Sequence, residues 1–245
     1  MRNWTIFWLT IFSIGMGYME SAVAIYLREI YYPNGFQFPL IPIEANIGLV
    51  ELIREAATII VLLGIGILSA KTTSLRFAGF IYSFAIWDLF YYIFLWIFLG
   101  WPESFFTWDL LFLIPVPWVG PVITPCIVSI TMIFLSLSIF YAHNVGLKTA
   151  LNAKEWGLFG VGSILIILSF IWDYLKYIHN EYLSIPDDVF SGKHDMLYAM
   201  KDYVPNDFNW SMFLAGESIL IYGIIIFINR IRIMKAVLSG RVNNE

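Results

Sequence analysis

The amino-acid sequence predicts an all-α polytopic membrane bundle of about six transmembrane helices. Of its 245 residues, 60% are hydrophobic and 13% charged, whereas a soluble domain is about 45 to 50% apolar and about 25% charged. The mean hydropathy is +0.76, and apolar stretches of about 20 residues, the length that spans a bilayer, recur along the chain. We therefore expect a single transmembrane domain over residues 1–245 with the lipid bilayer as its main partner.

Six stretches have the length and composition of spans: residues 4–27, 47–70, 77–99, 123–142, 157–178 and 210–231. The first resembles a secretion signal because Arg2 precedes an apolar run. It is nevertheless long enough to span and carries Glu20 near its end, so we expect it to remain as a helix.

Between the third and fourth spans, residues 101–122 contain four prolines: Pro102, Pro115, Pro117 and Pro121. Each proline removes a backbone donor and disfavours continuous helix. Thr107 is placed to cap a short helix over residues 108–114. We interpret the segment as re-entrant or interfacial, and a proline-rich surface loop fits the sequence equally well.

The distribution of Lys and Arg predicts the orientation. With the amino terminus inside, nine basic residues lie on the inner side and four on the outer side. We expect both termini to be cytoplasmic and the acidic loop at residues 179–209 to form an extracytoplasmic cap. The net charge of −4 is spread over loops, which argues against nucleic acid as a partner.

Charged residues inside the predicted spans are the most informative feature of the chain. A charge at the middle of a helix costs about 2.5 to 3.5 kcal/mol on insertion scales, so such residues are paired, hydrated or protonated. With the predicted topology, the seven residues named below all lie in the outer half of the bilayer, whereas Lys176 and Arg230, at the ends of their stretches, are counted with the flanking loops. We infer a polar cavity that opens to the extracytoplasmic side. The residues are Glu20, Glu51, Arg54, Glu55, Asp88, Asp173 and Glu217.

Helical spacing places Glu51, Arg54, Glu55 and Thr58 on one face of the second span, and this face is expected to point into the bundle.

On the first span, small residues such as Gly17 share a face with Glu20, which predicts close packing, most naturally against the second span. On the third span, Tyr91 or Tyr92 is placed to donate a hydrogen bond to Asp88.

The charges inside the spans do not balance, because one arginine cannot neutralise four neighbouring carboxylates. Protons, a cationic ligand or a metal ion would supply the remainder. Oxygen-only ligands suit a divalent metal such as calcium, magnesium or manganese, and a dinuclear iron site is also open. The residues of this predicted site are Glu20, Glu51, Glu55 and Asp88, oriented by Arg54, with Asp109, Asp173 and Glu217 as secondary members.

Four functional hypotheses follow. The first is a transporter or channel-like component whose carboxylate and arginine residues bind a cation or relay protons. The second is an intramembrane enzyme, metal-dependent or not, acting on a lipid or isoprenoid, which requires an apolar groove leading to the charged residues. The third is a structural or assembly subunit with membrane-protein partners. The fourth is a polar network centred on Arg54 that fixes helix packing and binds nothing.

Several catalytic signatures are absent from the sequence. It has no phosphate-binding loop, no His-Glu-x-x-His zinc motif, no Gly-x-Ser-x-Gly elbow and no pair of histidines on one helix for a haem. The single cysteine, Cys126, excludes an intramolecular disulfide and a thiolate metal cluster.

Four stretches of the first two thirds of the chain resemble a family of uncharacterised bacterial polytopic membrane proteins. The resemblance is compatible with a bacterial inner membrane. It implies no activity and transfers no functional residues. The stretches are residues 20–40, 51–58, 87–92 and 108–121.

Overall fold

The computed structural model describes residues 3–41, 43–181 and 202–242. Within these residues, six helices are long and apolar enough to cross a membrane. They match the six predicted spans to within a few residues, so the prediction of an all-α integral membrane protein is confirmed. The helices are α1 (Asn3–Tyr31), α2 (Ala45–Ser69), α3 (Thr73–Leu99), α4 (Ile123–Asn144), α5 (Ala153–Glu181) and α7 (Trp210–Val242).

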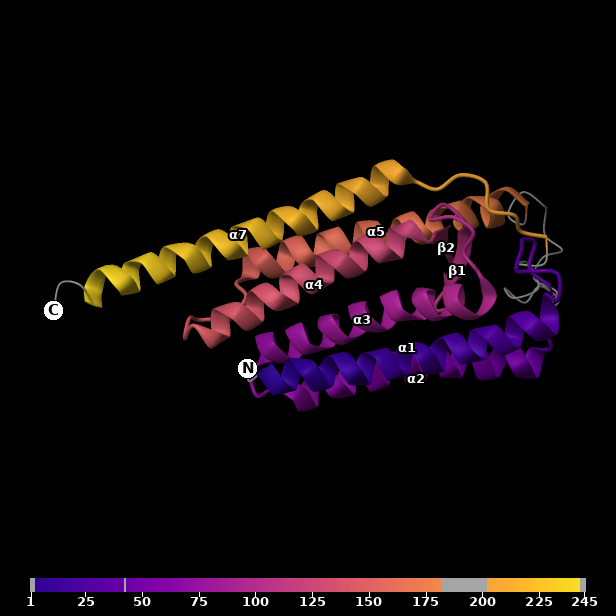
Figure 1. Cartoon of the computed structure of the whole chain (residues 1–245). Helices are drawn as coiled ribbons and strands as arrows, with labels where there is room; N and C mark the ends of the chain where they lie inside the picture. The colour runs from indigo at the N-terminus through magenta and orange to yellow at the C-terminus, as the bar shows by residue number, and fades with distance from the viewer. Residues whose placement is uncertain (1–2, 42, 182–201, 243–245) are drawn as a thin grey trace.

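The helices form two layers (Figure 1). One layer contains α1, α2 and α3, the other contains α4, α5 and α7, and packing of α3 against α4 joins the two. Helix α7 extends past the other helices toward the C-terminus, at the same end of the bundle as the N-terminus. From the end of the bundle that holds the N-terminus, successive helices run in alternating directions.

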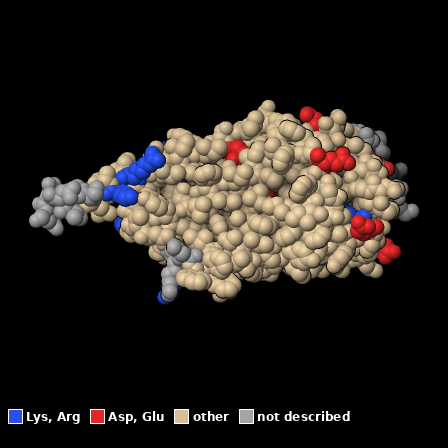
Figure 2. All heavy atoms as spheres, in the orientation of Figure 1, with Lys and Arg blue, Asp and Glu red and all other residues tan. Residues whose placement is uncertain are grey.

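The two ends of the bundle carry opposite charge (Figure 2). Lys and Arg gather at the end that holds the termini, and most Asp and Glu at the opposite end, with few charged atoms in the band between them. We call these the basic end and the hairpin end, because the second also carries the two strands. The uncharged band is what a protein surrounded by hydrocarbon presents.

Small residues allow the helices of each layer to approach closely. A Cβ added at Gly17 of α1 would lie 2.9 Å from the backbone oxygen of Trp87 on α3, and one at Gly66 of α2 would lie 2.7 Å from the backbone nitrogen of Phe80. The small face of α1 thus packs against α3, and the expectation that α2 is its main neighbour is wrong. Helix α3 occupies the centre of its layer.

The segment between α3 and α4 is a β-hairpin of β1 (Trp108–Phe112) and β2 (Trp118–Pro121). The strands are antiparallel, with Asp109 opposite Gly120. The expected short helix over residues 108–114 is therefore wrong. Prolines at 115 and 117 prevent a helix from continuing, and the cross-strand ladder satisfies backbone groups that a short helix would leave unpaired.

The predicted cap at residues 179–209 falls largely outside the described residues, because residues 182–201 are not among them. Its described end packs against the bundle. Tyr203 is buried and donates a hydrogen bond to Asp173 of α5 at 2.9 Å, and Phe208 contacts Phe170. This stretch covers part of α5 at the hairpin end.

Candidate functional site

A cavity of about 820 Å³ lies between the two layers. All six helices and the hairpin contribute to its wall. At the hairpin end it reaches the predicted site residues Glu20, Glu51, Arg54, Glu55 and Asp88, and toward the basic end it reaches apolar residues such as Phe77 and Phe159. The structure thus brings all five predicted site residues to a single chamber.

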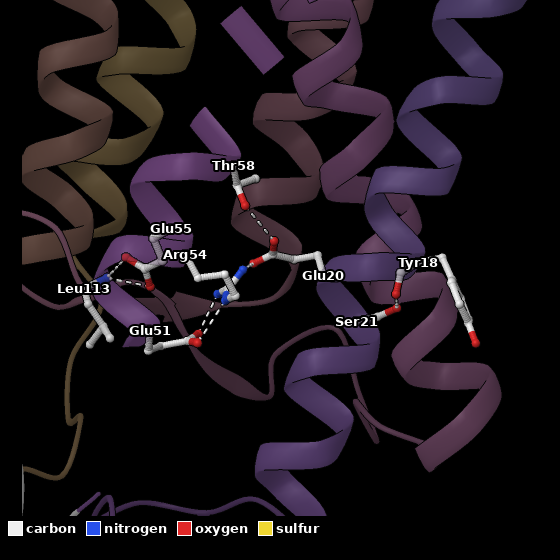
Figure 3. Close-up of polar contacts among 8 residues, drawn as sticks. All are labelled: Tyr18, Glu20, Ser21, Glu51, Arg54, Glu55, Thr58 and Leu113. Atoms are coloured by element: carbon white, nitrogen blue, oxygen red, sulfur yellow. Dashed lines mark hydrogen bonds and ion pairs between the residues drawn. The ribbon is translucent and has the colours of Figure 1, made fainter. Parts of the chain in front are cut away.

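Arg54 is the centre of the charged residues in this chamber (Figure 3). Its guanidinium donates to both oxygens of Glu51, at 2.9 Å from Nε and 2.5 Å from Nη2, and Nη1 donates to Glu20 of α1. Thr58 donates to the second oxygen of Glu20 at 3.1 Å. The polar face of α2 therefore points into the bundle, as its spacing predicts, and Arg54 joins α2 to α1.

Glu55 connects the same helix to the hairpin. The backbone N–H of Leu113 donates to its carboxylate, at 2.9 Å from one oxygen and 3.2 Å from the other (Figure 3). The Glu55 side chain is only 7% exposed, and no ion pair to it is found among the described residues. The Glu55 carboxylate is thus bound by a backbone N–H, in place of the Lys or Arg that usually pairs with a buried carboxylate.

Asp88 also has a neutral partner. Ser129 of α4 donates to it at 2.8 Å, which ties the two layers together beside the cavity. The predicted hydrogen bond from Tyr91 or Tyr92 to Asp88 is not found among the described residues, and Tyr92 donates instead to Asp109 of the hairpin at 3.1 Å.

Arg28 and Asp109 form an ion pair that the sequence analysis did not predict, although it named Asp109 as a secondary site residue. Their side chains are 10% and 1% exposed, and Arg28 Nη2 lies 3.0 Å from Asp109 Oδ1. The guanidinium also lies over the rings of Trp101 and Phe36, at 3.7 and 4.4 Å. Burial raises the pKa of the Asp109 carboxyl above its ordinary value, and Arg28 opposes that shift. The pair anchors the hairpin to the end of α1.

Apolar and aromatic side chains make the rest of the cavity wall. Those toward the basic end include Phe77, Phe80, Phe159, Leu220 and Ile224, whereas Phe84 and Phe170 lie beside Phe112 and Trp118 of the hairpin. Trp87 and Trp118 also line the cavity, and their buried indole N–H groups have no hydrogen-bond partner among the described residues. The chamber is therefore charged at one end and apolar along its length.

The ionisable residues of the cavity wall are unbalanced. Five carboxylates, Glu20, Glu51, Glu55, Asp88 and Asp109, face two guanidiniums, and both guanidiniums are already paired. Among the described residues, no three side chains of His, Cys, Asp or Glu form a group that would hold a metal ion. The divalent-metal hypothesis thus gains no support from the geometry, while the predicted excess of negative charge is present.

Two of the secondary site residues lie away from this wall. Asp173 accepts hydrogen bonds from Tyr203 and from the backbone of Asn206. Glu217 of α7 is 4% exposed and accepts a hydrogen bond from Thr131 of α4 at 2.9 Å. Both residues connect two elements of the bundle, and neither lines the cavity. The second carboxyl oxygen of Glu217 is buried and has no hydrogen-bond partner among the described residues.

At the basic end, the structure shows an ion pair that the charge pattern did not single out. Arg230 of α7 donates to both oxygens of the fully buried Glu155 of α5, at 2.8 and 2.9 Å. Glu155 precedes the predicted fifth span, so the pattern of charges inside the spans does not include it.

Comparison with known protein families, with curated proteins and with solved structures finds no match. The resemblance to bacterial membrane proteins stays a prediction, and the residues of the cavity alone carry the functional argument.

Proposed function

We propose that this integral membrane protein binds an amphipathic lipid or isoprenoid in its central cavity. The polar end of the ligand would lie against the carboxylates around Arg54, and its chain would lie among the phenylalanines toward the basic end. One observation carries the proposal: a single cavity of about 820 Å³ joins the charged residues to the apolar interior. Ligand sites are typically apolar chambers with a few placed polar groups.

This arrangement favours the lipid hypothesis over a cation site. A cation or proton pathway has no need of a long apolar chamber, whereas an amphipathic ligand requires one. A purely structural network explains the bonds of Arg54, but it does not explain why close-packed helices leave such a space. The charged end supplies carboxylates that are suited to acid and base chemistry on a bound lipid, so an intramembrane enzyme is one form of this function.

Entry from the bilayer is supported by the packing of the helices. The two layers are joined mainly by packing of α3 against α4, and among the described residues neither α1 nor α2 packs extensively against α5 or α7. The hairpin closes the space between the layers at one end (Figure 1). A lipid would therefore enter sideways from the bilayer, on the side of the bundle where the two layers are not packed against each other.

A second candidate is a proton-relaying transporter component, and the excess of three carboxylates over guanidiniums in the cavity favours it. Burial without a paired cation promotes protonation of a carboxylate. The two candidates differ in what they bind: the first requires an organic ligand, and the second requires only protons.

We place the basic end in the cytoplasm and the chain in a bacterial inner membrane. Positively charged loops remain on the cytoplasmic side during insertion, and Lys and Arg gather at this end (Figure 2). The carboxylates around Arg54 would then lie in the outer half of the bilayer. A ligand would present its polar end toward the outer leaflet.

Filling the cavity tests the proposal. Ile167 of α5 lines the chamber, whereas Ile164 on the same helix is 58% exposed and lies outside it. We expect Ile167→Trp to abolish binding of a lipid-like molecule and Ile164→Trp to leave it intact, because only the first inserts an indole into the space. Native mass spectrometry of the detergent-purified protein, followed by titration with fluorescent long-chain amphiphiles, measures both.

The wild-type protein and Ile164→Trp should retain a bound amphiphile that Ile167→Trp has lost. Failure of the wild-type protein to bind any amphiphile, or equal binding by Ile167→Trp, would contradict the proposal. Proton uptake without an organic ligand would favour the second candidate instead.

A further inference from the structure

A second, smaller pocket of about 340 Å³ lies at the basic end of the bundle. Residues 72–74, at the start of α3, form one wall, and residues 147–150, in the connection between α4 and α5, form the other. Among the described residues, no Asp or Glu lines this pocket, and it shares no lining residue with the central cavity. Its chemistry is therefore independent of the carboxylates around Arg54.

The first turn of α3 has free backbone donors beside the pocket. Thr72, which precedes the helix, makes no side-chain cap hydrogen bond. No acceptor for the backbone N–H groups of residues 73–75 is found in the described part of the chain. The first N–H groups of a helix have no partner within it, and the helix dipole places partial positive charge there. The start of α3 therefore favours an anion.

Two buried hydroxyl groups give independent evidence for a ligand. Ser74 and Thr149 are 7% and 9% exposed, and they come from opposite walls of the pocket. Within the described residues, neither hydroxyl has a hydrogen-bond partner, and neither oxygen is sealed off by surrounding atoms. Buried hydroxyls are normally hydrogen-bonded, so these two are donors available to a ligand that brings acceptor atoms.

Lys148 supplies a positive charge to the same pocket. It lines the wall beside Thr149, and no ion pair to it is found among the described residues. The connection that carries it is held in place, because Arg230, which is paired with Glu155, also donates to the backbone oxygen of Ala150 at 3.0 Å. The ammonium therefore extends from an anchored stretch of backbone.

We propose that this pocket binds a phosphate group, carried either by an anionic lipid head or by a soluble phosphate compound. The oxygens of a phosphate group accept hydrogen bonds from hydroxyl, backbone N–H and ammonium donors together, and its charge matches Lys148 and the start of α3. Water would satisfy the two hydroxyls but would bring no negative charge. A cation is disfavoured, because the wall offers it no carboxylate.

Two titrations of the detergent-purified full-length protein at low ionic strength test the site and separate the two sources. Calorimetry with inorganic phosphate is the first, and calorimetry with dioctanoyl phosphatidic acid is the second, with dioctanoylglycerol as the reference that lacks the phosphate. Saturable binding of inorganic phosphate would support a soluble compound as the ligand. Binding of phosphatidic acid alone would support a lipid head. Binding of neither probe would overturn the phosphate site.

Variants show whether a bound probe occupies this pocket. Lys148→Met, at an exposed position, should weaken binding of the phosphate probe by about tenfold or more, about 1.4 kcal/mol. The double variant Ser74→Ala with Thr149→Val removes both hydroxyls with little change of shape and should also weaken it. Lys154→Met is the matched control, because this lysine is exposed at the same end and does not line the pocket.

Lys154→Met should bind the probe as the wild type does. Ile167→Trp, which fills the central cavity, should do so too, so that failure of this site and failure of lipid binding in the cavity can be told apart. Equal affinity of the wild type, Lys148→Met and the double variant would mean an adventitious ion only and would overturn the proposal. Because the Lys148 side chain is exposed, its replacement decides the question even if the double variant does not fold.

Discussion

Arg54 illustrates how a single side chain can define a polar site inside a membrane protein. A guanidinium presents five donors in a planar fork, and this fork matches a carboxylate with two parallel hydrogen bonds while a further donor reaches another group. Arg54 uses this geometry to hold Glu51 on its own helix and Glu20 on α1. A lysine ammonium at the same place would keep the charge but lose the fork.

Removing the positive charge of Arg54 should therefore destabilise the protein more than replacing its guanidinium with an ammonium. We expect Arg54→Met to lower the free energy of unfolding by about 3 kcal/mol, because it leaves carboxylates without their counter-ion. Arg54→Lys should lower it by about 1 to 2 kcal/mol, the scale of lost charge-assisted hydrogen bonds. Thermal unfolding in a single detergent measures both against Lys71→Met, which changes an exposed residue. An Arg54→Met protein that melts with the wild type would contradict this role.

At the residue scale, the sequence predicted which charges gather but not all of their partners. Charge within an apolar span is costly wherever it occurs, so Glu20, Arg54 and Asp88 stand out from the sequence alone. The partner of a buried group is set by tertiary packing. Asp109 lies 81 residues from Arg28 in the chain, and no local spacing connects two residues that far apart.

At the scale of elements, close helix contacts depend on residues without a side chain. Gly17 and Gly15 lie two positions apart on α1, yet only Gly17 faces α3. A Cβ at Gly17 would lie 2.9 Å from the backbone oxygen of Trp87, whereas one at Gly15 would have nothing within 4 Å. Gly17 therefore serves as the test position and Gly15 as its control on the same helix.

We expect Gly17→Val to lower the free energy of unfolding by about 1 to 3 kcal/mol, because overpacking forces the helices apart. Gly15→Val should have a much smaller effect, since its side chain would enter open space. Thermal unfolding of both variants in the same detergent measures the difference. Equal melting temperatures for the two would show that α1 does not pack against α3 through this face.

The hairpin shows where prediction from patterns fails at this scale. The prolines in residues 101–122 predict that no long helix forms there, and the structure confirms this. The choice between a short helix and two paired strands depends on partners that the segment meets in the fold. Asp109 is held by Arg28 and Tyr92, and the backbone N–H of Leu113 by Glu55. These contacts come from three different helices.

At the scale of the whole molecule, apolar length and composition were sufficient to predict the architecture. Spanning helices must satisfy their own backbone groups and present an apolar surface, so the sequence signal is strong. The cavity was expected as a polar space near one membrane surface. An apolar extension was expected under the enzyme hypothesis alone, and no sequence pattern located it, because the inner and the lipid-facing sides of a membrane helix are both apolar and do not differ in pattern.

The orientation of the bundle is the last prediction at this scale. If the basic end is cytoplasmic, a cysteine at Lys148, in the connection between α4 and α5, should be hidden from reagents outside the cell. A cysteine at Glu103, which precedes the hairpin at the opposite end, should be accessible. Both positions are exposed, and Cys126→Ser removes the single native thiol, so each variant carries one reporter.

A membrane-impermeant maleimide applied to intact cells, with any outer membrane first made permeable, should label Glu103→Cys and leave Lys148→Cys unlabelled. Disruption of the inner membrane should then allow Lys148→Cys to react, which shows that its thiol is reactive. The reverse pattern would place the basic end outside and contradict the charge rule on which the orientation rests. It would also move the carboxylates around Arg54 to the cytoplasmic half, so that a lipid would have to enter from the inner leaflet with its head toward the cytoplasm.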